Sequence, residues 1–280
     1  MTRVAIQGVS GCYHEMAAKD FFQGKEEIEI CPCLSFPEMF EELKKDRNML
    51  AAMAIENTIA GSLLQNHELL RESDMRIIGE YKLHISHTLA ALPGQTIEDI
   101  TEVNSHPIAL MQCMEYLQKW PGIKIVEKED TAGSACDIQQ QQLTGHAAIC
   151  SEYAAKMYGL TILARAIETN KRNFTRFLIL ADQWIADEYI DKNKVNKSSL
   201  AFCVAHTHGS LSKVLTILSF YDINLTKIQS MPIIGREWEY RFYIDLTFDD
   251  YTRYKQALEA IIPFTKDIKI LGEYEEYKLQ

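Results

Sequence analysis

The chain has 280 residues, of which 47% are apolar and 24% charged, a composition typical of a soluble globular protein with more than one domain and not of disordered or fibrous proteins. Its formal net charge of −10 argues against a nucleic-acid partner, which would need Lys and Arg clustered on one face. The sequence has neither an apolar run of the roughly eighteen residues that a membrane helix needs nor a secretory leader, so we expect a cytoplasmic protein without a membrane partner.

The seven cysteines do not predict a metal site. Most are scattered through apolar or helical segments, where a free cysteine behaves as a small hydrophobic residue. The pair in Cys31-Pro32-Cys33 is too close for a usual zinc pair, and no cluster of His or Cys follows at a suitable spacing. We therefore expect no metal.

The first 72 residues alternate between strand and helix patterns. The predicted elements are a strand over 3–7, a helix from Glu15, a strand over 28–33, a helix over 37–45, a strand over 50–55 and a helix over 59–72. This order predicts a mainly parallel sheet with helices on its faces, and such sheets bind ligands at the carboxyl ends of their strands. The glycine turn from Gly8 to Gly11 either binds an anion through the amides at the helix start or is a tight turn without a ligand.

Polar residues Glu56, Asn57 and Thr58 follow the third strand at such a carboxyl end. Glu56 is a candidate ligand contact, but it is equally suited to interact with a helix dipole or to cap a helix. Asn57 and Thr58 also fit capping.

The middle of the chain predicts a second set of strands and helices. The expected elements are strands over 76–92, a helix opening at Ser105-His106-Pro107, a strand over 123–126, a helix from Thr131, a strand over 146–150 and a helix over 151–158. The chain then returns through a strand over 173–180. We therefore expect an α/β fold with two lobes facing each other across a cleft: residues 1–77 and 165–182 form the first lobe, and residues 78–164 the second.

The returning strand carries the most unusual pattern in the sequence, since Thr175 and Arg176 interrupt an apolar run that ends at Leu180. Their side chains point to opposite faces of an extended strand, so both serve one ligand only where the strand end twists or borders a cleft. The alternative is a structural role, with Thr175 as an ordinary strand residue and Arg176 paired with a core carboxylate.

A polar segment over 183–197 is a predicted linker, and a different pattern follows it. Apolar and polar residues alternate from Trp238 to Phe248, which predicts a strand with one buried face. With the flanking elements, residues 198–280 read βαββαβ, a ferredoxin-like unit.

Several motifs in the expected order resemble those of prephenate dehydratases. The strand motif Asn173-Phe174-Thr175-Arg176-Phe177 resembles the family's central Asn-x-Thr-Arg-Phe. The segment over 54–62 resembles its Pro-Ile-Glu-Asn-Ser/Thr-x-x-Gly-Ser motif, with Ala54 in place of Pro. Ser105-His106-Pro107 resembles its Ser-His-Pro-Gln motif, with Ile108 in place of Gln. The segment after the linker resembles an ACT domain.

The resemblance implies a catalytic domain over 1–182, similar in fold to type II periplasmic binding proteins, that converts prephenate to phenylpyruvate without a cofactor. Thr175 would hydrogen-bond the departing hydroxyl, either relaying a proton or stabilising charge, and Arg176 would bind a substrate carboxylate. The expected substrate-binding residues are Glu56, Asn57, Thr58, Gly61, Ser62, Asn173 and Phe177. The alternatives are arogenate as the substrate, or a two-lobed ligand-binding protein without catalysis.

The resemblance to ACT domains implies a homodimer or homotetramer that is inhibited by phenylalanine. The expected effector residues are His208, Gly209, Ser210 and Leu211 at a helix start, with Asn224, Leu225, Gln229 and Ser230 on a strand. The family's Glu-Ser-Arg-Pro segment reads Gln229-Ser230-Met231-Pro232 here, so one negative and one positive charge are missing. The alternative is a domain that only dimerises.

Overall fold

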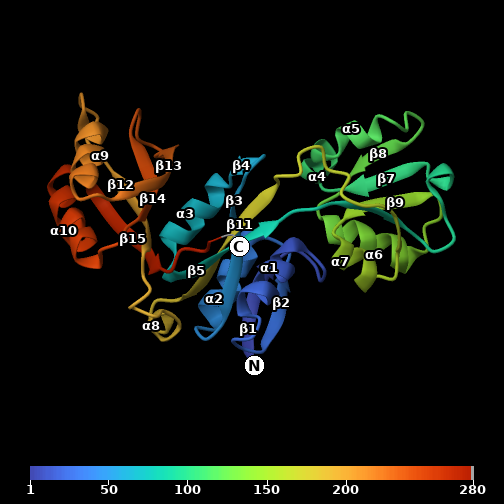
Figure 1. Cartoon of the computed structure of the whole chain (residues 1–280), viewed down its shortest axis with the longest axis horizontal. Coiled ribbons are helices and arrows are strands. Elements are labelled where there is room, and N and C mark those ends of the chain that lie inside the picture. Colours follow the sequence, from blue (N-terminus) through green and yellow to red (C-terminus); the bar gives the residue numbers. More distant parts are fainter. Residues whose placement is uncertain (279–280) are drawn as a thin grey trace.

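The computed structural model describes residues 1–278, which form three units in a row (Figure 1). The first lobe contains β1 to β5 and β11, the second lobe contains β6 to β10, and the C-terminal unit contains β12 to β15. The first lobe lies in the middle (Figure 1) and contacts both other units, for example through Glu15 with Tyr153 and Ile77 with Gly272. Within residues 1–278, no helix has the length and apolar character needed to span a membrane.

The first lobe is built on a sheet with the strand order β5-β11-β3-β1-β2. Its strands are β1 (Thr2–Gln7), β2 (Ile28–Cys33), β3 (Leu50–Asn57), β4 (Gly61–Ser62), which pairs with β3, β5 (Met75–His84) and β11 (Phe174–Asp182). The strands β2, β1 and β3 are parallel, as predicted, while the returning strand β11 runs antiparallel to β3 and β5.

Alternation along β1 explains why helices cover both faces of this sheet. Val4 and Ile6 point to one face, where they pack with residues of α1 (Tyr13–Phe22) and α8 (Ala186–Tyr189). Ala5 points to the other face and packs with residues of α2 (Phe36–Lys45) and α3 (Leu64–Glu72). All three β1 residues are fully buried, as expected for a sheet covered on both sides.

Two sequence-based boundaries in the first lobe were wrong. The lobe does not end at residue 77, because β5 pairs with β11 as far as His84 and therefore belongs to the same sheet. The helix expected over 59–72 begins only at Leu64. The amide groups of Ile59 and Ala60 donate to the side-chain Oδ1 of Asn57, which forms a turn there, and β4 occupies the next residues.

The second lobe contains a five-stranded sheet with the order β10-β6-β9-β7-β8. Its strands are β6 (Thr88–Ala91), β7 (Glu102–Ser105), β8 (Lys124–Glu127), β9 (His146–Cys150) and β10 (Thr161–Ala164). Its helices are η1 (Ile97–Asp99), α4 (Pro107–Gln112), α5 (Met114–Leu117), α6 (Thr131–Gln141) and α7 (Glu152–Met157). The chain enters this lobe through residues 85–87 and leaves it through residues 165–173.

The C-terminal unit has the predicted order βαββαβ. Its elements are β12 (Lys197–Cys203), α9 (Ser210–Phe220), β13 (Asn224–Pro232), β14 (Tyr240–Thr247), α10 (Tyr251–Ile261), η2 (Ile262–Phe264) and β15 (Lys266–Tyr274). Its sheet continues into that of the first lobe, because Gly272 of β15 pairs with Ile77 of β5. A Cβ atom at position 272 would collide with the Ile77 carbonyl oxygen, so the close approach of the two sheets requires glycine.

Both faces of β14 are buried, although its sequence predicted one exposed face. Ile244 and Leu246 pack against the helices of the C-terminal unit, as expected. Tyr243 and Asp245, on the opposite face, are also buried, because the first lobe covers them. The contact between the two units is thus partly polar and deeply buried.

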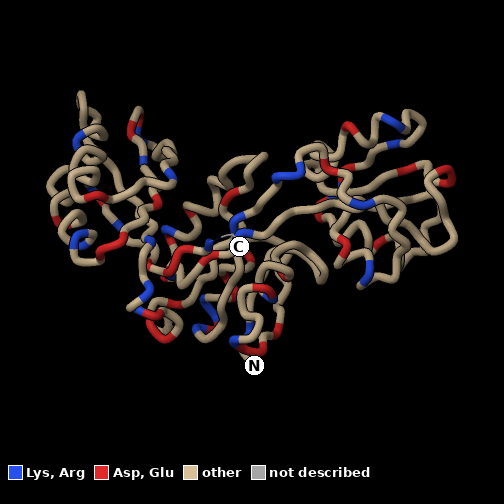
Figure 2. Tube along the Cα trace, viewed as in Figure 1, with Lys and Arg blue, Asp and Glu red and all other residues tan. Residues whose placement is uncertain are grey.

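Charged residues are distributed over all three units. Figure 2 shows Lys and Arg interspersed with Asp and Glu along the whole trace, rather than gathered on one face. Within residues 1–278, no group of three or more His, Cys, Asp or Glu side chains is arranged to hold a metal ion.

Candidate functional site

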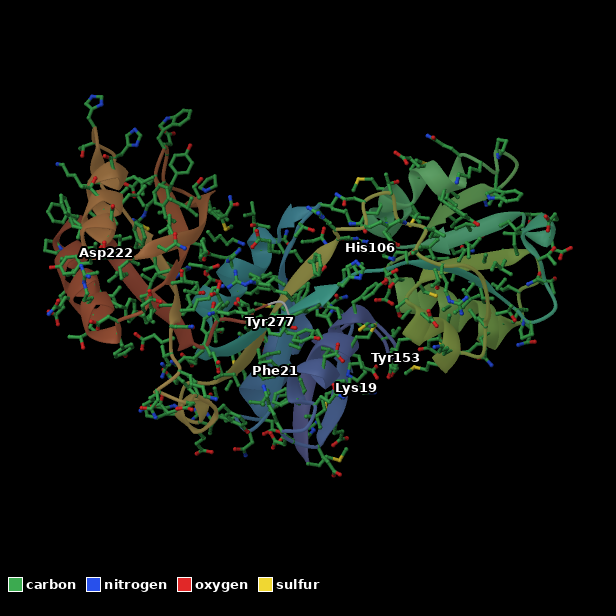
Figure 3. The ribbon with its side chains drawn as sticks, in the orientation of Figure 1. Lys19, Phe21, His106, Tyr153, Asp222 and Tyr277 are labelled. Carbon is green, nitrogen blue, oxygen red and sulfur yellow. The ribbon has the colours of Figure 1, made fainter. Side chains whose placement is uncertain are left out.

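The two lobes enclose a pocket of about 400 Å³. The first lobe contributes the start of α1, the carboxyl end of β3, the beginning of β11 and the turn around β4. The second lobe contributes the starts of α4 and α6. The lining residues are Gln7, Cys12, Tyr13, His14, Ala54, Asn57, Ala60, Gly61, Ser62, Leu63, Ile85, His87, His106, Ile108, Ala109, Gln112, Glu129, Asp130, Thr131, Thr175 and Phe177. In Figure 3, His106 lies between the two lobes, close to the segments that connect them.

A second hollow, of about 540 Å³, lies between α1, the linker and the C-terminal tail, close to Phe21 and Tyr277 (Figure 3). Among the residues that the structure describes, none of its lining residues belongs to the predicted substrate-binding set. The interlobe pocket is therefore the candidate site.

Thr175 is the second residue of β11, and its hydroxyl is anchored in the pocket by Asn57. The Nδ2 of Asn57 donates to Thr175 Oγ1 at 3.0 Å and to Asn173 Oδ1 at 2.8 Å. The Oδ1 of Asn57 accepts from two backbone amides, which fixes the orientation of its side-chain amide. Because Thr175 Oγ1 accepts from Asn57, its own proton remains available as a donor to a ligand in the pocket.

A chain of buried polar groups supports this arrangement from the second lobe. Asn173 Nδ2 donates to Gln112 Oε1 at 2.9 Å, and His87 Nε2 lies 2.9 Å from the same oxygen. The Tyr13 hydroxyl lies 3.0 Å from His87 Nδ1 and 2.8 Å from the Ser86 carbonyl, and its single proton donates to one of them at a time. Because Gln112 Oε1 can only accept, neutral His87 carries its proton on Nε2.

Sequence reasoning did not identify Gln112, His87 or Tyr13 as site residues. The available signal was the placement of a polar residue within an apolar pattern. Gln112 is buried next to Ala109 and Cys113 in the core of the second lobe, and His87 precedes a fully buried strand. Buried polar side chains must be hydrogen-bonded, so such positions predict a polar network, although not its partners.

Burial disfavours the charged forms of several side chains in the pocket. Burial lowers the pKa of His14 to about 3, and its Nε2 accepts from the Ala54 amide at 3.3 Å. Burial also lowers the pKa values of His87 and His106 and raises the pKa of Asp130. No Lys or Arg lines the pocket in the described part of the chain, whereas Glu129 and Asp130 do.

The glycine turn contacts the second lobe through its carbonyl oxygens, since Ser151 and Tyr158 donate to those of Gly11 and Ser10. The amide of Gly8 donates to the Cys33 carbonyl at 2.9 Å, and the amide of Gly11 donates to Glu15 Oε2 at 2.7 Å. A Cβ atom on Gly8 would lie 3.0 Å from Asp130 Oδ2. Because the amides of Gly8 and Gly11 have partners inside the protein, the geometry favours the alternative of a tight turn without a ligand.

Beside this turn, a cluster of side chains joins the lobes (Figure 3). Tyr153 of the second lobe donates to Glu15 Oε1 at 2.9 Å, and Lys19 Nζ lies 2.6 Å from the same oxygen. The start of α1 is thus fixed to α7.

Arg176 does not lie in the pocket, and the expectation that it binds a substrate carboxylate was wrong on this geometry. Its side chain points to the opposite face of β11, where it pairs with Glu80 and Asp245. Glu56 also leaves the pocket and pairs with Lys227 at 2.9 Å. The alternation of side chains along a strand explains both placements, because Glu56 directly precedes Asn57 and Arg176 directly follows Thr175.

The other predicted substrate-binding residues divide into two groups. Asn57, Gly61, Ser62 and Phe177 line the pocket with Thr175. Asn173 is fully buried behind it. The Thr58 hydroxyl joins the end of β3 to the start of β11 by accepting from the Phe174 amide at 3.0 Å.

The expected effector residues lie on two separate parts of the C-terminal unit. Gly209, Ser210 and Leu211 line a hollow of about 220 Å³ at the start of α9, together with Trp238. The remaining turn residue, His208, is exposed beside it. The strand residues Asn224, Leu225, Gln229 and Ser230 lie on β13, at the end of the sheet order, and do not line this hollow.

In comparisons with known proteins, a family model, a relative and a solved structure agree on one family, and another similar structure has a different description. The family model described as prephenate dehydratase matches residues 4–184. A protein of Arabidopsis thaliana named arogenate dehydratase/prephenate dehydratase 2, chloroplastic, is 37% identical over 97% of this chain and 72% of its own length. A structure of prephenate dehydratase from Arthrobacter aurescens in complex with L-Phe has a TM-score of 0.86 and 25% identity, covering 98% of this chain and 90% of that one. A structure described as a novel type of quorum quenching acylase has a TM-score of 0.87 and 28% identity, covering 98% of both chains.

Proposed function

Because this chain belongs to the prephenate dehydratase family, we propose that it converts prephenate to phenylpyruvate, carbon dioxide and water in phenylalanine biosynthesis. Prephenate carries a carboxylate and a pyruvyl arm on one ring carbon and a hydroxyl on the opposite carbon. The bond to the carboxylate breaks and leaves its electron pair in the ring, while the opposite C–O bond breaks and hydroxide takes up a proton. The ring becomes aromatic, which drives the reaction without a cofactor.

The observation that carries the proposal is the Thr175 hydroxyl, held by Asn57 with its own proton free to point into the interlobe pocket. This proton donates a hydrogen bond to the departing oxygen. The bond strengthens as negative charge develops on that oxygen, so it stabilises the transition state more than the bound substrate.

The carboxylates of the substrate are held by neutral donors, because the described lining residues include no Lys or Arg. Ser62 and Thr131, which each carry a hydroxyl, line the pocket. The start of α6 is already capped by Asp130, whose Oδ1 accepts from the Gly133 amide at 2.7 Å. We therefore assign carboxylate binding to the Ser62 and Thr131 hydroxyls in place of Arg176.

The test is direct. The purified protein is incubated with prephenate, and the ultraviolet absorbance of phenylpyruvate is followed, with Thr175→Ala as the comparison. We expect turnover by the wild type and a large loss in the variant. A folded wild-type protein that converts neither prephenate nor arogenate would contradict the proposed function.

The charge of the pocket favours arogenate as a second candidate substrate. Arogenate has an ammonium group in place of the keto oxygen, so it is one charge less negative than prephenate. Glu129 and Asp130 attract that ammonium group and repel the prephenate dianion. Kinetics of the two substrates side by side decide between them. Asp130→Asn, which keeps a good helix cap, should shift the ratio of kcat/KM toward prephenate.

Regulation by phenylalanine completes the proposal. The C-terminal unit has the element order of an ACT domain, and the related Arthrobacter aurescens protein was crystallised with L-Phe. Because the expected effector residues on α9 and β13 do not share a hollow within one chain, a second copy would complete the site. We propose a homodimer or homotetramer joined through this unit.

The regulatory proposal is tested by light scattering for the oligomeric state, with calorimetry and an inhibition assay for phenylalanine. Absence of both inhibition and heat at millimolar concentration would leave the unit as a dimerisation module.

A further inference from the structure

Two adjacent pairs of residues connect the pocket to the C-terminal unit. Thr175 pairs with Asn57 across β11 and β3, and both side chains line the pocket. The next residue on β11, Arg176, pairs with Glu56 across the same two strands, and both side chains point to the opposite face. At each strand end, one residue therefore faces the pocket and its neighbour faces the C-terminal unit.

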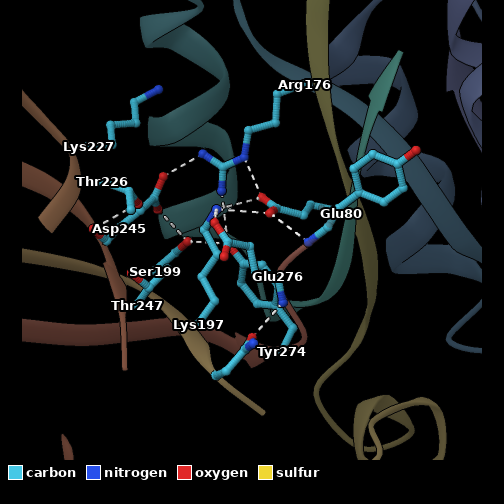
Figure 4. A network of polar contacts seen from close by, with 12 residues as sticks. Glu80, Arg176, Lys197, Ser199, Thr226, Lys227, Asp245, Thr247, Tyr274 and Glu276 are labelled. Atoms are coloured by element: carbon cyan, nitrogen blue, oxygen red, sulfur yellow. Dashed lines mark hydrogen bonds and ion pairs between the residues drawn. The ribbon is translucent and has the colours of Figure 1, made fainter. Parts of the chain in front are cut away.

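Arg176 uses its whole guanidinium group at the contact between the two units (Figure 4). Its Nε donates to Glu80 Oε2 at 2.6 Å, within the first lobe. Its Nη1 donates to Asp245 on β14, and its Nη2 donates to the Tyr274 hydroxyl on β15 at 2.9 Å. With only 11% of its side chain exposed, Arg176 is held by partners from both units.

The partners of Arg176 are themselves fixed by further contacts (Figure 4). Lys197 Nζ lies 2.9 Å from Glu80 Oε1, and both side chains are almost fully buried. Ser199 donates to Asp245 Oδ1 at 2.5 Å. Burial alone would raise the pKa of Asp245, but Arg176 lowers it to about 2, so this carboxylate is charged at neutral pH. Opposite charges are thus paired throughout the network.

The backbone at Arg176 is held by strand pairing and by these side-chain contacts. The pairing of β11 with β3 shifts register between Arg176 and Phe177, so the strand end that carries Thr175 is offset from the regular ladder behind it. Such irregularities change the direction in which a side chain points. On the other edge of β11, Phe174 to Ile179 pair with β5 without a shift, so β5 fixes the path of the strand end and the contacts of Arg176 fix it further on the side of the C-terminal unit.

From this geometry we infer that Arg176 is a positioning residue for Thr175, and that Asp245 of the C-terminal unit sets its position. Lys227 on β13 acts in the same way on Glu56, and hence on Asn57. β13 also carries the four strand residues proposed to contact an effector. Movement of that strand is therefore transmitted through Glu56 and Asn57 to the Thr175 hydroxyl. This inference rests on the proposed function, because it concerns the same hydroxyl.

Asp245→Asn tests the inference, since it removes the charge that pairs with Arg176 while it preserves size. We expect kcat for the substrate that the wild type turns over to fall about ten- to hundredfold, with KM within about twofold, because misplacement of a reacting group has effects of this order. In a Thr175→Ala background the same substitution should have almost no further effect on kcat. If Asp245→Asn unfolds the protein, Tyr274→Phe removes one contact to Arg176 more gently and should lower kcat severalfold.

Two matched controls separate positioning from general stability. Glu68→Gln breaks another ion pair between the same two units, with Arg241 at 2.9 Å. Among the described residues, the polar partners of Glu68 lie on α3 and β14 and not on β3 or β11. Asp222→Asn removes a carboxylate that pairs with Arg253 at 2.7 Å, far from the first lobe (Figure 3). Both should keep wild-type kcat when folded.

Three results would overturn the inference: unchanged kcat in folded Asp245→Asn, an undiminished effect of Asp245→Asn in the Thr175→Ala background, or an equal loss of kcat in Glu68→Gln. Loss of the proposed function is distinguishable from all three, because the wild type itself would then turn over neither prephenate nor arogenate.

Discussion

Replacement of Thr175 by valine is the sharpest test of the catalytic geometry. Valine is also β-branched and has nearly the same shape, so it fits the strand and removes only the hydroxyl. That hydroxyl supplies one hydrogen bond to charge that develops in a pocket with no Lys or Arg among its described lining residues. One such bond contributes about 2–4 kcal/mol to transition-state stabilisation, so kcat should fall by roughly two to three decades.

The structure also predicts that this variant remains folded. After loss of the Thr175 oxygen, Asn57 Nδ2 still donates to Asn173 Oδ1 at 2.8 Å and to the Phe174 carbonyl at 3.2 Å. No buried donor is left without a partner, so the free energy of unfolding should change by less than about 1 kcal/mol.

The assay combines steady-state kinetics on prephenate with thermal melting of the same samples. Thr175→Ser restores the hydroxyl without the methyl group and should retain more activity than either the valine or the alanine variant. A valine variant with kcat within about threefold of the wild type would refute the role of the hydroxyl.

The remaining predictions concern stability. Gly272→Ala should destabilise the protein strongly, because its Cβ would collide with the Ile77 carbonyl, and denaturant unfolding should show a lower midpoint. His67→Phe should maintain or raise the melting temperature. The His67 ring packs 4.9 Å from that of Tyr243, and the buried Nε2 of His67 has no partner among the described residues. A clear fall in melting temperature would indicate that a bound water satisfies that nitrogen. Burial opposes ionisation of Glu68, yet hydrogen bonds from Arg71 and Tyr243 lower its pKa to about 2. The contribution of Glu68 to the free energy of unfolding is therefore present above about pH 4 and is lost as the pH falls toward 2. Glu68→Gln should reduce the dependence of stability on pH in this range, measured by unfolding at a series of acid pH values.

Much of the fold was predictable because local patterns determine it. The parallel strands of the first lobe follow from short apolar runs separated by amphipathic helices. The βαββαβ order of the C-terminal unit follows from the change to period-two alternation. The position of Thr175 at a strand end beside a pocket follows from a polar residue that interrupts an apolar run.

Contacts between distant segments were not predictable in this way. Nothing around Asp245 indicates that the polar face of β14 is covered by the first lobe, or that Arg176 is its partner. The alternative interpretation of Arg176, as the partner of a buried carboxylate, is the one that the geometry supports. The sequence placed Thr175 and Arg176 on opposite faces of the strand, but only the fold determines what each face meets.

The continuous sheet formed by the first lobe and the C-terminal unit has a consequence for dissecting the protein. A fragment that stops before β12 would expose the edge of β5, the apolar surface that now packs against Leu271 and Tyr274, and the Glu80–Arg176 ion pair without its partners Lys197 and Asp245. An open strand edge beside apolar surface is a template for aggregation. Such a fragment would require its own compensating substitutions, such as a lysine or proline along β5, before it could be handled as a separate domain.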